Sequence, residues 1–399
     1  MKRILYFVFW VIFCTSCGNF LEEYSQDLVY AQSCEDLDEI LIGNGYMAQP
    51  TTPSYFSYGD KAFYYPYLHV MDDDIEEYLT GNANISSSIN PVTTLRNFYI
   101  WAKEPFMRIS GLTFRDYDWK RMYEHIGYLN VIISYVKEFH EDSEEMRHRI
   151  LGEAQFLRAG YYFMLVNLYA NPYSKETADA TMGVPLNLTE YIEEGYFSRD
   201  PVAAVYRQIV TDLENAIVNL SGIKQPTIYR VNEKAARALL SRVYLYMGEW
   251  QLVIDECDEI IKMGCSLWDL NNFDPGTATF GCKRDYFLAK ESPEIFFTQG
   301  AGVVGLLMDN QNITSQTRYR ASDELYGIYS KYEKDGILDL RKNCFFEMSK
   351  RDNGYFFVRK NPMFDATVFD SFLLRSGEIY LNKAEAQAML DQADAINTM

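Results

Sequence analysis

Two apolar stripes of helical period, between Asn232 and Ile261, constrain the fold of this 399-residue chain more than any other feature. In the first stripe, apolar residues recur at i, i+3, i+4, i+7, i+8 and i+11 from Ala236, which is the period of one helix face. Asn232 precedes the stripe as a good N-cap, and Gly248 follows it as a good C-terminal residue. The second stripe begins at Trp250. We therefore expect two amphipathic helices joined by a tight turn.

This predicted hairpin follows a degenerate tetratricopeptide-type pattern. The pattern has small residues, a tyrosine, a glycine and an aromatic residue at fixed offsets. Val253 stands where the pattern has alanine. One such hairpin cannot bury its apolar faces alone, so we expect neighbouring helical hairpins. The matching residues are Leu240, Ser241, Tyr244, Gly248 and Trp250.

Helical period also recurs over four longer stretches outside this hairpin. These stretches are residues 119–139, 144–170, 200–220 and 371–390. Asp200 is a good N-cap for the third stretch, with Pro201 as its first helical residue. A shorter amphipathic helix is expected at residues 35–46, whereas residues 264–360 are rich in loops. The chain is therefore predicted to be mostly α-helical.

Charge and composition exclude some classes of function. The formal net charge of −19 at pH 7 argues against a nucleic-acid partner, because little could neutralise a row of phosphates. A negative surface suits solubility or a neutral ligand. Aromatic residues make up 16% of the chain, including 32 tyrosines. Tyrosine combines a flat apolar face with a polar tip, which suits both a core and a stacking site.

Residues 1–16 have the features of an export signal. Lys2 and Arg3 give a positive start, and the apolar core at residues 4–13 is too short to span a bilayer. Small residues then lead to Cys17, in a pattern that resembles the lipidation site of a bacterial lipoprotein. Cys14 departs from the leucine usual in such sites, and an ordinary secretory signal is the alternative. We expect a lipid anchor on Cys17.

The remaining cysteines indicate neither a zinc site nor a disulfide framework, because their spacing is wide and their number odd. We expect packed thiols. The run Asp72-Asp73-Asp74 lacks the alternating spacing of a calcium loop, so a solvated turn is favoured. No metal ion and no cofactor is expected. The five cysteines are Cys34, Cys257, Cys265, Cys282 and Cys344.

No catalytic motif stands out. The chain has no GxSxG or HExxH motif, and its four histidines lack the spacing of metal ligands. Gly300 to Gly305 fits GxGxxG, but no surrounding βαβ pattern supports a dinucleotide site, so a glycine loop is favoured. With 56 acidic residues the sequence leaves room for a pair of glycosidase carboxylates. A hydrolase is therefore the competing class of function.

Several stretches, in the same order along the chain, resemble the SusD/RagB family of Bacteroidetes outer-membrane lipoproteins. The most specific is RILGEAQFLRAGYYFMLVNLYANPY at residues 149–173, with its E-A-x-F-L-R-A core. The others are CGNFLEEYSQD at residues 17–27, WKRMYEHIGYLNVII at 119–133, DPVAAVYRQIVTDLENAIVNL at 200–220, VNEKAARALLSRVYLYMGEW at 231–250 and LLRSGEIYLNKAEAQAML at 373–390.

The resemblance implies a tetratricopeptide-like helical scaffold with an irregular, loop-rich ligand face. It divides the chain into a signal peptide at residues 1–16, a SusD-like N-terminal region at 17–225 and a C-terminal region at 226–399. Members usually continue further, so the last region is expected to be incomplete. The implied role is capture of glycans or other nutrients at the cell surface for a SusC-like, TonB-dependent transporter, without catalysis.

The family's ligand-binding residues vary, so none carries over by alignment, and candidates come from residue type and position. Aromatic rings outside the predicted scaffold helices could stack on the apolar face of a sugar. Packing in the core is the alternative for each of them. A transporter-capping protein that does not touch the ligand is a third possibility. The candidates are Trp101 and Trp268, whose indoles offer the largest faces, and Tyr64, Tyr65, Tyr67 and Tyr286.

Overall fold

The computed structural model describes most of the chain beyond residue 30. The described residues are 31–48, 63–78, 91–107, 111, 113, 115–191, 197–274, 287–301, 318–331, 333–348, 355–356, 368, 371–392 and 394–398. The predictions made for residues 1–16, Cys17, Cys282 and Tyr286 fall outside these ranges.

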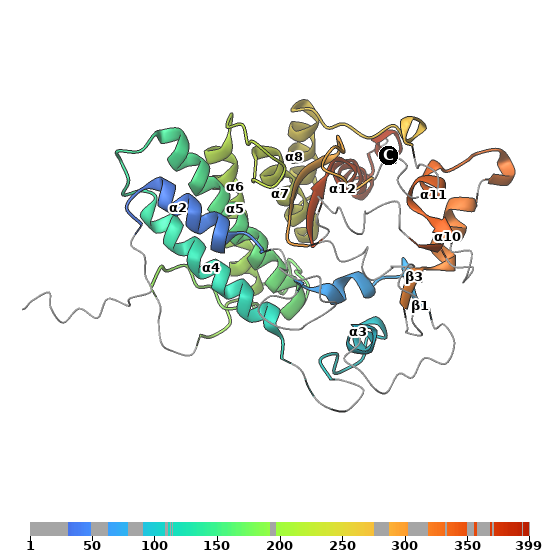
Figure 1. The fold of residues 1–399 in the computed structure, drawn as a ribbon, viewed down its shortest axis with the longest axis horizontal. Helices are drawn as coiled ribbons and strands as arrows, with labels where there is room; N and C mark the ends of the chain where they lie inside the picture. Colours follow the sequence, from blue (N-terminus) through green and yellow to red (C-terminus); the bar gives the residue numbers. More distant parts are fainter. Residues whose placement is uncertain are drawn as a thin grey trace, which may run out of the picture.

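The described chain is mostly α-helical, which confirms the predicted fold class (Figure 1). Six long helices form a scaffold. Each helix from α4 to α7 packs against the next one along the chain, and α12 packs against α8. The long helices are α4 (Tyr117–Tyr135), α5 (Glu144–Tyr169), α6 (Val202–Leu220), α7 (Glu233–Met247), α8 (Trp250–Lys262) and α12 (Ser376–Met389).

The predicted hairpin is present as α7 and α8. The side chain of Asn232 accepts a hydrogen bond from the backbone N–H of Ala235 at 3.0 Å, as an N-cap should. Gly248 ends α7 in the left-handed conformation, with φ 70°. Leu239 and Leu240 are buried, so the apolar stripe faces the core as its spacing predicted.

Shorter elements gather beside the scaffold. Within the described residues three antiparallel strand pairs form, β1 with β3, β2 with β6 and β4 with β5. The elements are α2 (Cys34–Ile40), η1 (Leu41–Gly45), η2 (Pro66–Val70), β1 (Ile75–Tyr78), α3 (Pro91–Tyr99), η3 (Leu270–Asn272), β2 (Ile295–Gln299), β3 (Arg318–Ala321), α10 (Asp323–Ser330), η4 (Glu333–Asp335), α11 (Leu340–Phe345), β4 (Glu347–Met348), β5 (Tyr355–Phe356), β6 (Phe372–Arg375) and α13 (Ala395–Thr398).

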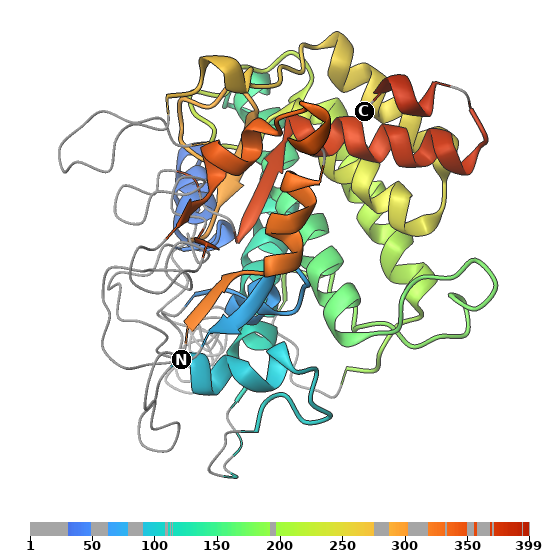
Figure 2. The same cartoon turned by 90° about the vertical axis from the view of Figure 1, so that its right-hand side faces the viewer.

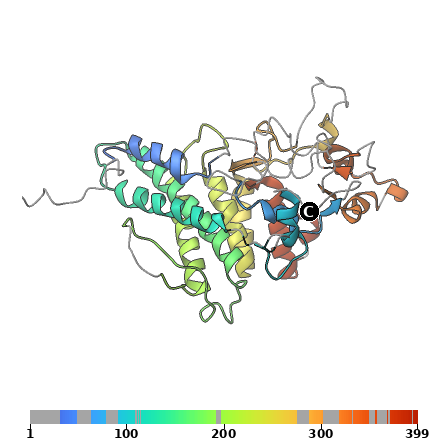
Figure 3. The same ribbon diagram turned by 60° about the horizontal axis from the view of Figure 1, so that its bottom comes forward.

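These shorter elements are not spread evenly around the scaffold. Helix α2 lies along the scaffold helices, whereas α3, β1, β3, α10 and α11 lie together at the opposite end of the molecule (Figures 1 and 3). Figure 2 faces that end and shows the β1–β3 pair with α3 on one side of it. We call these five elements the loop-rich side. The resemblance had implied such an irregular face.

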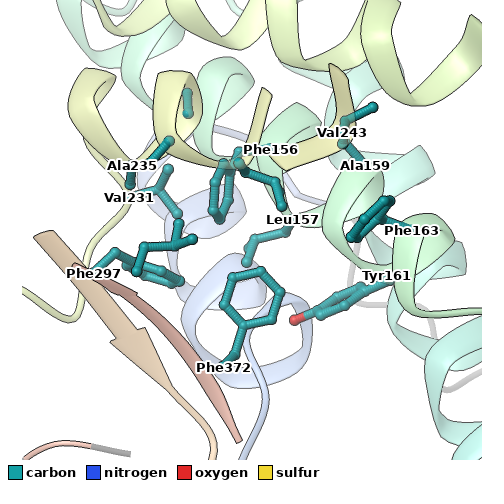
Figure 4. Close-up of a cluster of buried hydrophobic side chains, with 14 of the residues drawn as sticks. Phe156, Leu157, Ala159, Tyr161, Phe163, Val231, Ala235, Val243, Phe297 and Phe372 are labelled. Carbon is teal, nitrogen blue, oxygen red and sulfur yellow. The ribbon is translucent and has the colours of Figure 1, made fainter. Parts of the chain in front are cut away.

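A cluster of phenylalanines joins the scaffold to the β2–β6 pair (Figure 4). Phe156 on α5 meets Phe297 on β2 edge-on, with ring centroids 5.3 Å apart, and Phe372 on β6 at 6.0 Å. Phe297 and Phe372 also contact each other at 5.9 Å. All three rings are buried. Residues far apart in the sequence therefore share one core.

The helix predicted at residues 371–390 begins later than expected. Residues 372–375 form strand β6 and pair with β2. Phe372 and Leu374 are buried while their neighbours are only partly buried, which is the period-2 pattern of a strand. The antiparallel pairing of β2 with β6 does not match the parallel sheet of a dinucleotide-binding fold.

The predicted start of α6 is also wrong in detail. Pro201 takes the N-cap position and Val202 is the first helical residue. Asp200 does not cap the helix, because its side chain instead accepts a hydrogen bond from the backbone N–H of Leu186 at 2.8 Å. Its carboxylate therefore fixes a loop rather than a helix end.

The cysteines within the described residues are packed thiols, as predicted. Cys34, Cys257 and Cys344 are buried and Cys265 is half-buried, and none of the four is in a disulfide. Burial raises the pKa of Cys34 to about 11 and that of Cys257 to about 12, so neither is a reactive thiolate. The Asp72-Asp73-Asp74 run is an exposed turn.

Candidate functional site

The candidate aromatic residues occupy very different environments. Trp101 is 70% exposed, and Trp268 is half-buried. Tyr64, Tyr65 and Tyr67 are only 4%, 2% and 4% exposed, so the expectation that they offer open stacking faces is wrong. These three tyrosines are instead packed in the core, which was the alternative interpretation.

Trp101 lies in the turn that ends α3. Its backbone N–H donates to the carbonyl of Phe98 at 3.0 Å, and the N–H of Ala102 donates to the carbonyl of Asn97 at 2.8 Å. These two bonds form a Schellman motif, in which the residue after the helix is left-handed. Trp101 is that residue, with φ 51°. The turn therefore carries a large indole that is mostly exposed.

A stack of rings lies beneath this turn. Tyr67 and Phe98 stack nearly parallel, with centroids 4.3 Å apart and planes at 11°. Phe106 meets Phe98 edge-on at 5.1 Å and Tyr67 at 6.1 Å. The side-chain amide of Asn97 also donates to the backbone carbonyl of Met107. We call Tyr67, Phe98 and Phe106 the aromatic base, because it supports the turn that carries Trp101.

The buried tyrosines also attach the 63–67 segment to α4. The backbone N–H of Tyr65 donates to Asp118 at 3.1 Å, and Asp118 pairs with Arg121. The Arg121 guanidinium lies 3.8 Å from the ring centroid of Tyr64. The Tyr64 hydroxyl and Nε2 of His125 are 2.9 Å apart. The scaffold therefore fixes the segment that supplies Tyr67 to the aromatic base.

Burial has the largest influence on the pKa values of Asp118 and His125, two of the groups that attach the 63–67 segment to α4. It raises the pKa of Asp118 to about 6, although the neighbouring Arg121 acts in the opposite direction. Burial also lowers the pKa of His125. A neutral His125 has one donor and one acceptor nitrogen, which suits a bond with the Tyr64 hydroxyl.

Trp268 belongs to a different group of rings. Its indole stacks on Phe287 at 6.2 Å and meets Phe273 edge-on at 5.3 Å. Its backbone N–H donates to Glu294 at 2.9 Å. Its ring partners are not those of the Trp101 turn, and its own ring is partly covered. Trp101 is therefore the better stacking candidate of the two.

Sequence reasoning missed two buried ion-pair networks. The first centres on Glu153, which is fully buried on α5. Its carboxylate accepts hydrogen bonds from Gln225 and Arg230, both at 2.9 Å, and from the Tyr46 hydroxyl. Arg230 also pairs with Asp38 of α2. This network attaches α2 and the 225–231 loop to the scaffold.

Arginines also decide the ionisation of Asp38. Burial acts to raise the pKa of Asp38, but hydrogen bonds from Arg230 and Arg149 outweigh it and lower the pKa. The stabilisation from this carboxylate is therefore present above its ordinary pKa of 3.8 and is lost as the pH falls through the lowered value.

The second network centres on Arg158, one turn and a half further along α5. Its guanidinium forms two hydrogen bonds to Asp212 of α6, at 2.8 and 2.6 Å, and a third to Asn130 of α4 at 2.9 Å. The amide of Asn130 then donates to the carbonyls of Asn187 and Thr189. One arginine thus connects three helices and a loop.

A signal for both networks was present in the sequence. Glu153 and Arg158 are the charged residues of the E-A-x-F-L-R-A core. Ala154, Phe156 and Leu157 between them are also buried, so this part of the helix is enclosed by protein. A charge in such a place needs a partner. The sequence could have indicated the need, but not which residues meet it.

Comparison with known proteins agrees with this architecture. The family model "SusD-like_3: Starch-binding associating with outer membrane" matches residues 71–245. SusD-like protein P25 of Formosa agariphila is 26% identical over 268 residues, which is 66% of this chain. The aligned part spans 46% of that relative, so this chain covers less than half of its length.

Solved structures show the same fold. A SusD superfamily protein from Bacteroides thetaiotaomicron superposes with a TM-score of 0.66 at 20% identity, covering 92% of this chain and 78% of that one. A putative sugar-binding protein from Bacteroides vulgatus gives a TM-score of 0.68 at 24% identity, covering 92% and 77%. The chain therefore has the fold of these SusD-like structures, and its residues 71–245 match the SusD-like family model.

The range matched by the family model contains most of the features described above. Glu153, Arg158 and Asp212 lie within residues 71–245, as does Trp101, whereas Trp268 lies outside. Among the helices that the structure describes, none is both long enough and apolar enough to cross a membrane.

Proposed function

We propose that this SusD-like protein binds neutral glycans at the cell surface and delivers oligosaccharides to a SusC-like, TonB-dependent transporter. The family description names starch binding and association with the outer membrane. One of its structural neighbours is described as a putative sugar-binding protein. Lipidation of Cys17 would supply the membrane anchor in this proposal.

The observation that carries the proposal is the exposed indole of Trp101. A sugar ring presents an apolar face of C–H groups, and an open aromatic ring is a suitable surface for it. The residues that follow, Lys103 and Glu104, are both exposed and carry opposite charges. The sequence next to Trp101 therefore adds no net charge, which is compatible with a neutral sugar.

The binding claim is tested by calorimetry against neutral polysaccharides, namely soluble starch, laminarin and mannan. A shallow stacking site is expected to bind with a dissociation constant between millimolar and micromolar, or roughly 4 to 8 kcal/mol. Trp101→Ala should weaken binding about ten-fold, because the loss of an aromatic contact costs on the order of 1 kcal/mol beyond its area. Trp268→Ala should have the smaller effect, since that indole is partly covered.

Tyr128→Ala is the matched control, because Tyr128 is an exposed aromatic residue on scaffold helix α4. It should bind the polysaccharide as the parent does. If Trp101→Ala also binds like the parent, Trp101 is not the platform. Release of reducing ends during the incubation would favour the alternative of a surface hydrolase. Transporter binding without any glycan affinity would favour a capping protein.

The anchor is tested separately. Cys17→Ser cannot be lipidated, so the variant should leave the membrane fraction for the soluble one. Stable anchoring needs two acyl chains or an equivalent second signal, and this variant would lack both chains. Retention in the membrane fraction would contradict a lipid anchor at Cys17.

A further inference from the structure

Trp101 shares its backbone geometry with the residues that end α7 and α12. At all three helix ends the left-handed residue donates its N–H to the carbonyl three residues earlier, and the next residue donates to the carbonyl five residues before itself. The left-handed residues are Gly248 with φ 70°, Asp391 with φ 55° and Trp101 with φ 51°. The same turn is thus built with a glycine, an aspartate and a tryptophan.

Only the tryptophan is unexpected at such a position. Glycine adopts the left-handed conformation without a steric penalty, and aspartate is enriched there among other residues. A bulky residue in this conformation lowers the folding equilibrium constant by about five-fold or more. Burial of the ring could offset that loss, but the side chain of Trp101 is 70% exposed. The fold therefore gains little from having tryptophan at this position.

The turn is nevertheless firmly supported. Within the aromatic base, Phe98 of α3 packs against Tyr67 and Phe106, and the Asn97 amide donates a hydrogen bond to the carbonyl of Met107. A supported turn presents the indole without a further loss of backbone freedom on binding. Preorganisation of this kind raises affinity, because less entropy is lost when the complex forms.

We propose that Trp101 occupies a position suited to glycine because its indole serves as a preorganised stacking surface for a neutral sugar ring, at a cost in folding stability. This inference rests on the proposed glycan-binding function and assigns it to one turn. Asn97 and the aromatic base act as positioning residues, since they hold the turn and leave the indole face open.

The test combines stability and binding in three variants. Trp101→Gly relieves the strain and removes the ring, whereas Trp101→Ala removes the ring and keeps a strained residue. Asp391→Gly is the matched control, at the same kind of helix end outside the proposed site. Unfolding in urea gives the folding equilibrium constant, and calorimetry with soluble starch, laminarin and mannan gives affinity.

We expect Trp101→Gly to fold with an equilibrium constant about five-fold above that of Trp101→Ala, and above that of the parent. Its affinity for the polysaccharide that the parent binds should fall about ten-fold, as for Trp101→Ala. Asp391→Gly should gain no more stability than Trp101→Gly and should bind like the parent.

The outcomes separate this inference from the proposed function. A Trp101→Gly variant no more stable than Trp101→Ala would overturn the claim of a strained turn. A variant that is more stable and still binds like the parent would overturn the role of the indole. If the parent binds none of the polysaccharides, the proposed function fails, and the binding role of Trp101 fails with it.

Discussion

Replacing Arg158 with methionine is expected to lower the free energy of unfolding by about 3–5 kcal/mol. Arg158 and Asp212 form a bidentate pair whose side chains are 8% and 2% exposed. Removal of the guanidinium leaves the Asp212 carboxylate buried with no opposing charge in the pair. It also removes the donor to Asn130, whose amide holds the 187–189 loop. Urea denaturation of the parent and the variant measures the difference.

A surface ion pair made by α6, the helix that carries Asp212, is the control. Arg207 of α6 lies 3.3 Å from Asp179, with side chains that are 66% and 83% exposed. Because exposed pairs contribute little, Arg207→Ala should change stability by less than about 1 kcal/mol. The double variant Arg158→Met with Asp212→Leu should recover part of the loss, since no unpaired charge remains. Equal effects of Arg158→Met and Arg207→Ala would contradict the role assigned to the buried pair.

The second large effect is expected for Glu153→Gln. Glu153 and Asp38 together balance Arg149 and Arg230, so the variant leaves two arginines with one carboxylate in a largely buried place. One partner of a buried pair is lost, and we again expect a loss of about 3–5 kcal/mol. The Tyr46 hydroxyl keeps an acceptor, because a glutamine side chain retains one oxygen.

The loss should have a local signature. The Glu153 network attaches α2 to the scaffold, so amides of α2 should exchange with solvent much faster in Glu153→Gln, while those of α7 follow global unfolding. Arg237→Ala is a suitable control. Arg237 pairs with Glu233 and Glu256 on α7 and α8, away from α2. If Glu153→Gln leaves α2 protected as in the parent, the network does not hold that helix in place.

The two networks give a physical reason for the most specific stretch of the sequence. Glu153 and Arg158 stand five residues apart on α5, and each reaches a different set of neighbours. Glu153 connects to α2 and the 225–231 loop, and Arg158 to α4 and α6. The four residues between them are also buried. Through Glu153 and Arg158, this stretch of α5 is therefore connected to α2, α4, α6 and the 225–231 loop.

The candidate site was predicted only in part. Residue type and loop position led to Trp101, Tyr65 and Tyr67 alike, and the sequence could not separate them. In the structure Tyr67 is stacked between other rings, whereas the indole of Trp101 is open. Phe98 and Phe106 were not predicted to take part. Exposure depends on the residues packed around a side chain, and those come from distant parts of the chain.

Periodicity and capping involve residues within about four positions of one another, and these local signals were sufficient to predict the helices. The stripe from Ala236, the N-cap Asn232 and the left-handed Gly248 all appear where local chemistry predicted them. The tertiary structure alone decided that residues 372–375 pair as a strand and that Asp200 bonds to a loop. It also brought Glu153 to Arg230, and left the Trp101 ring in solvent. Such outcomes depend on contacts between residues that lie 14 positions apart, as for Asp200 and Leu186, or many more, as the 77 between Glu153 and Arg230. No local sequence pattern contains this information.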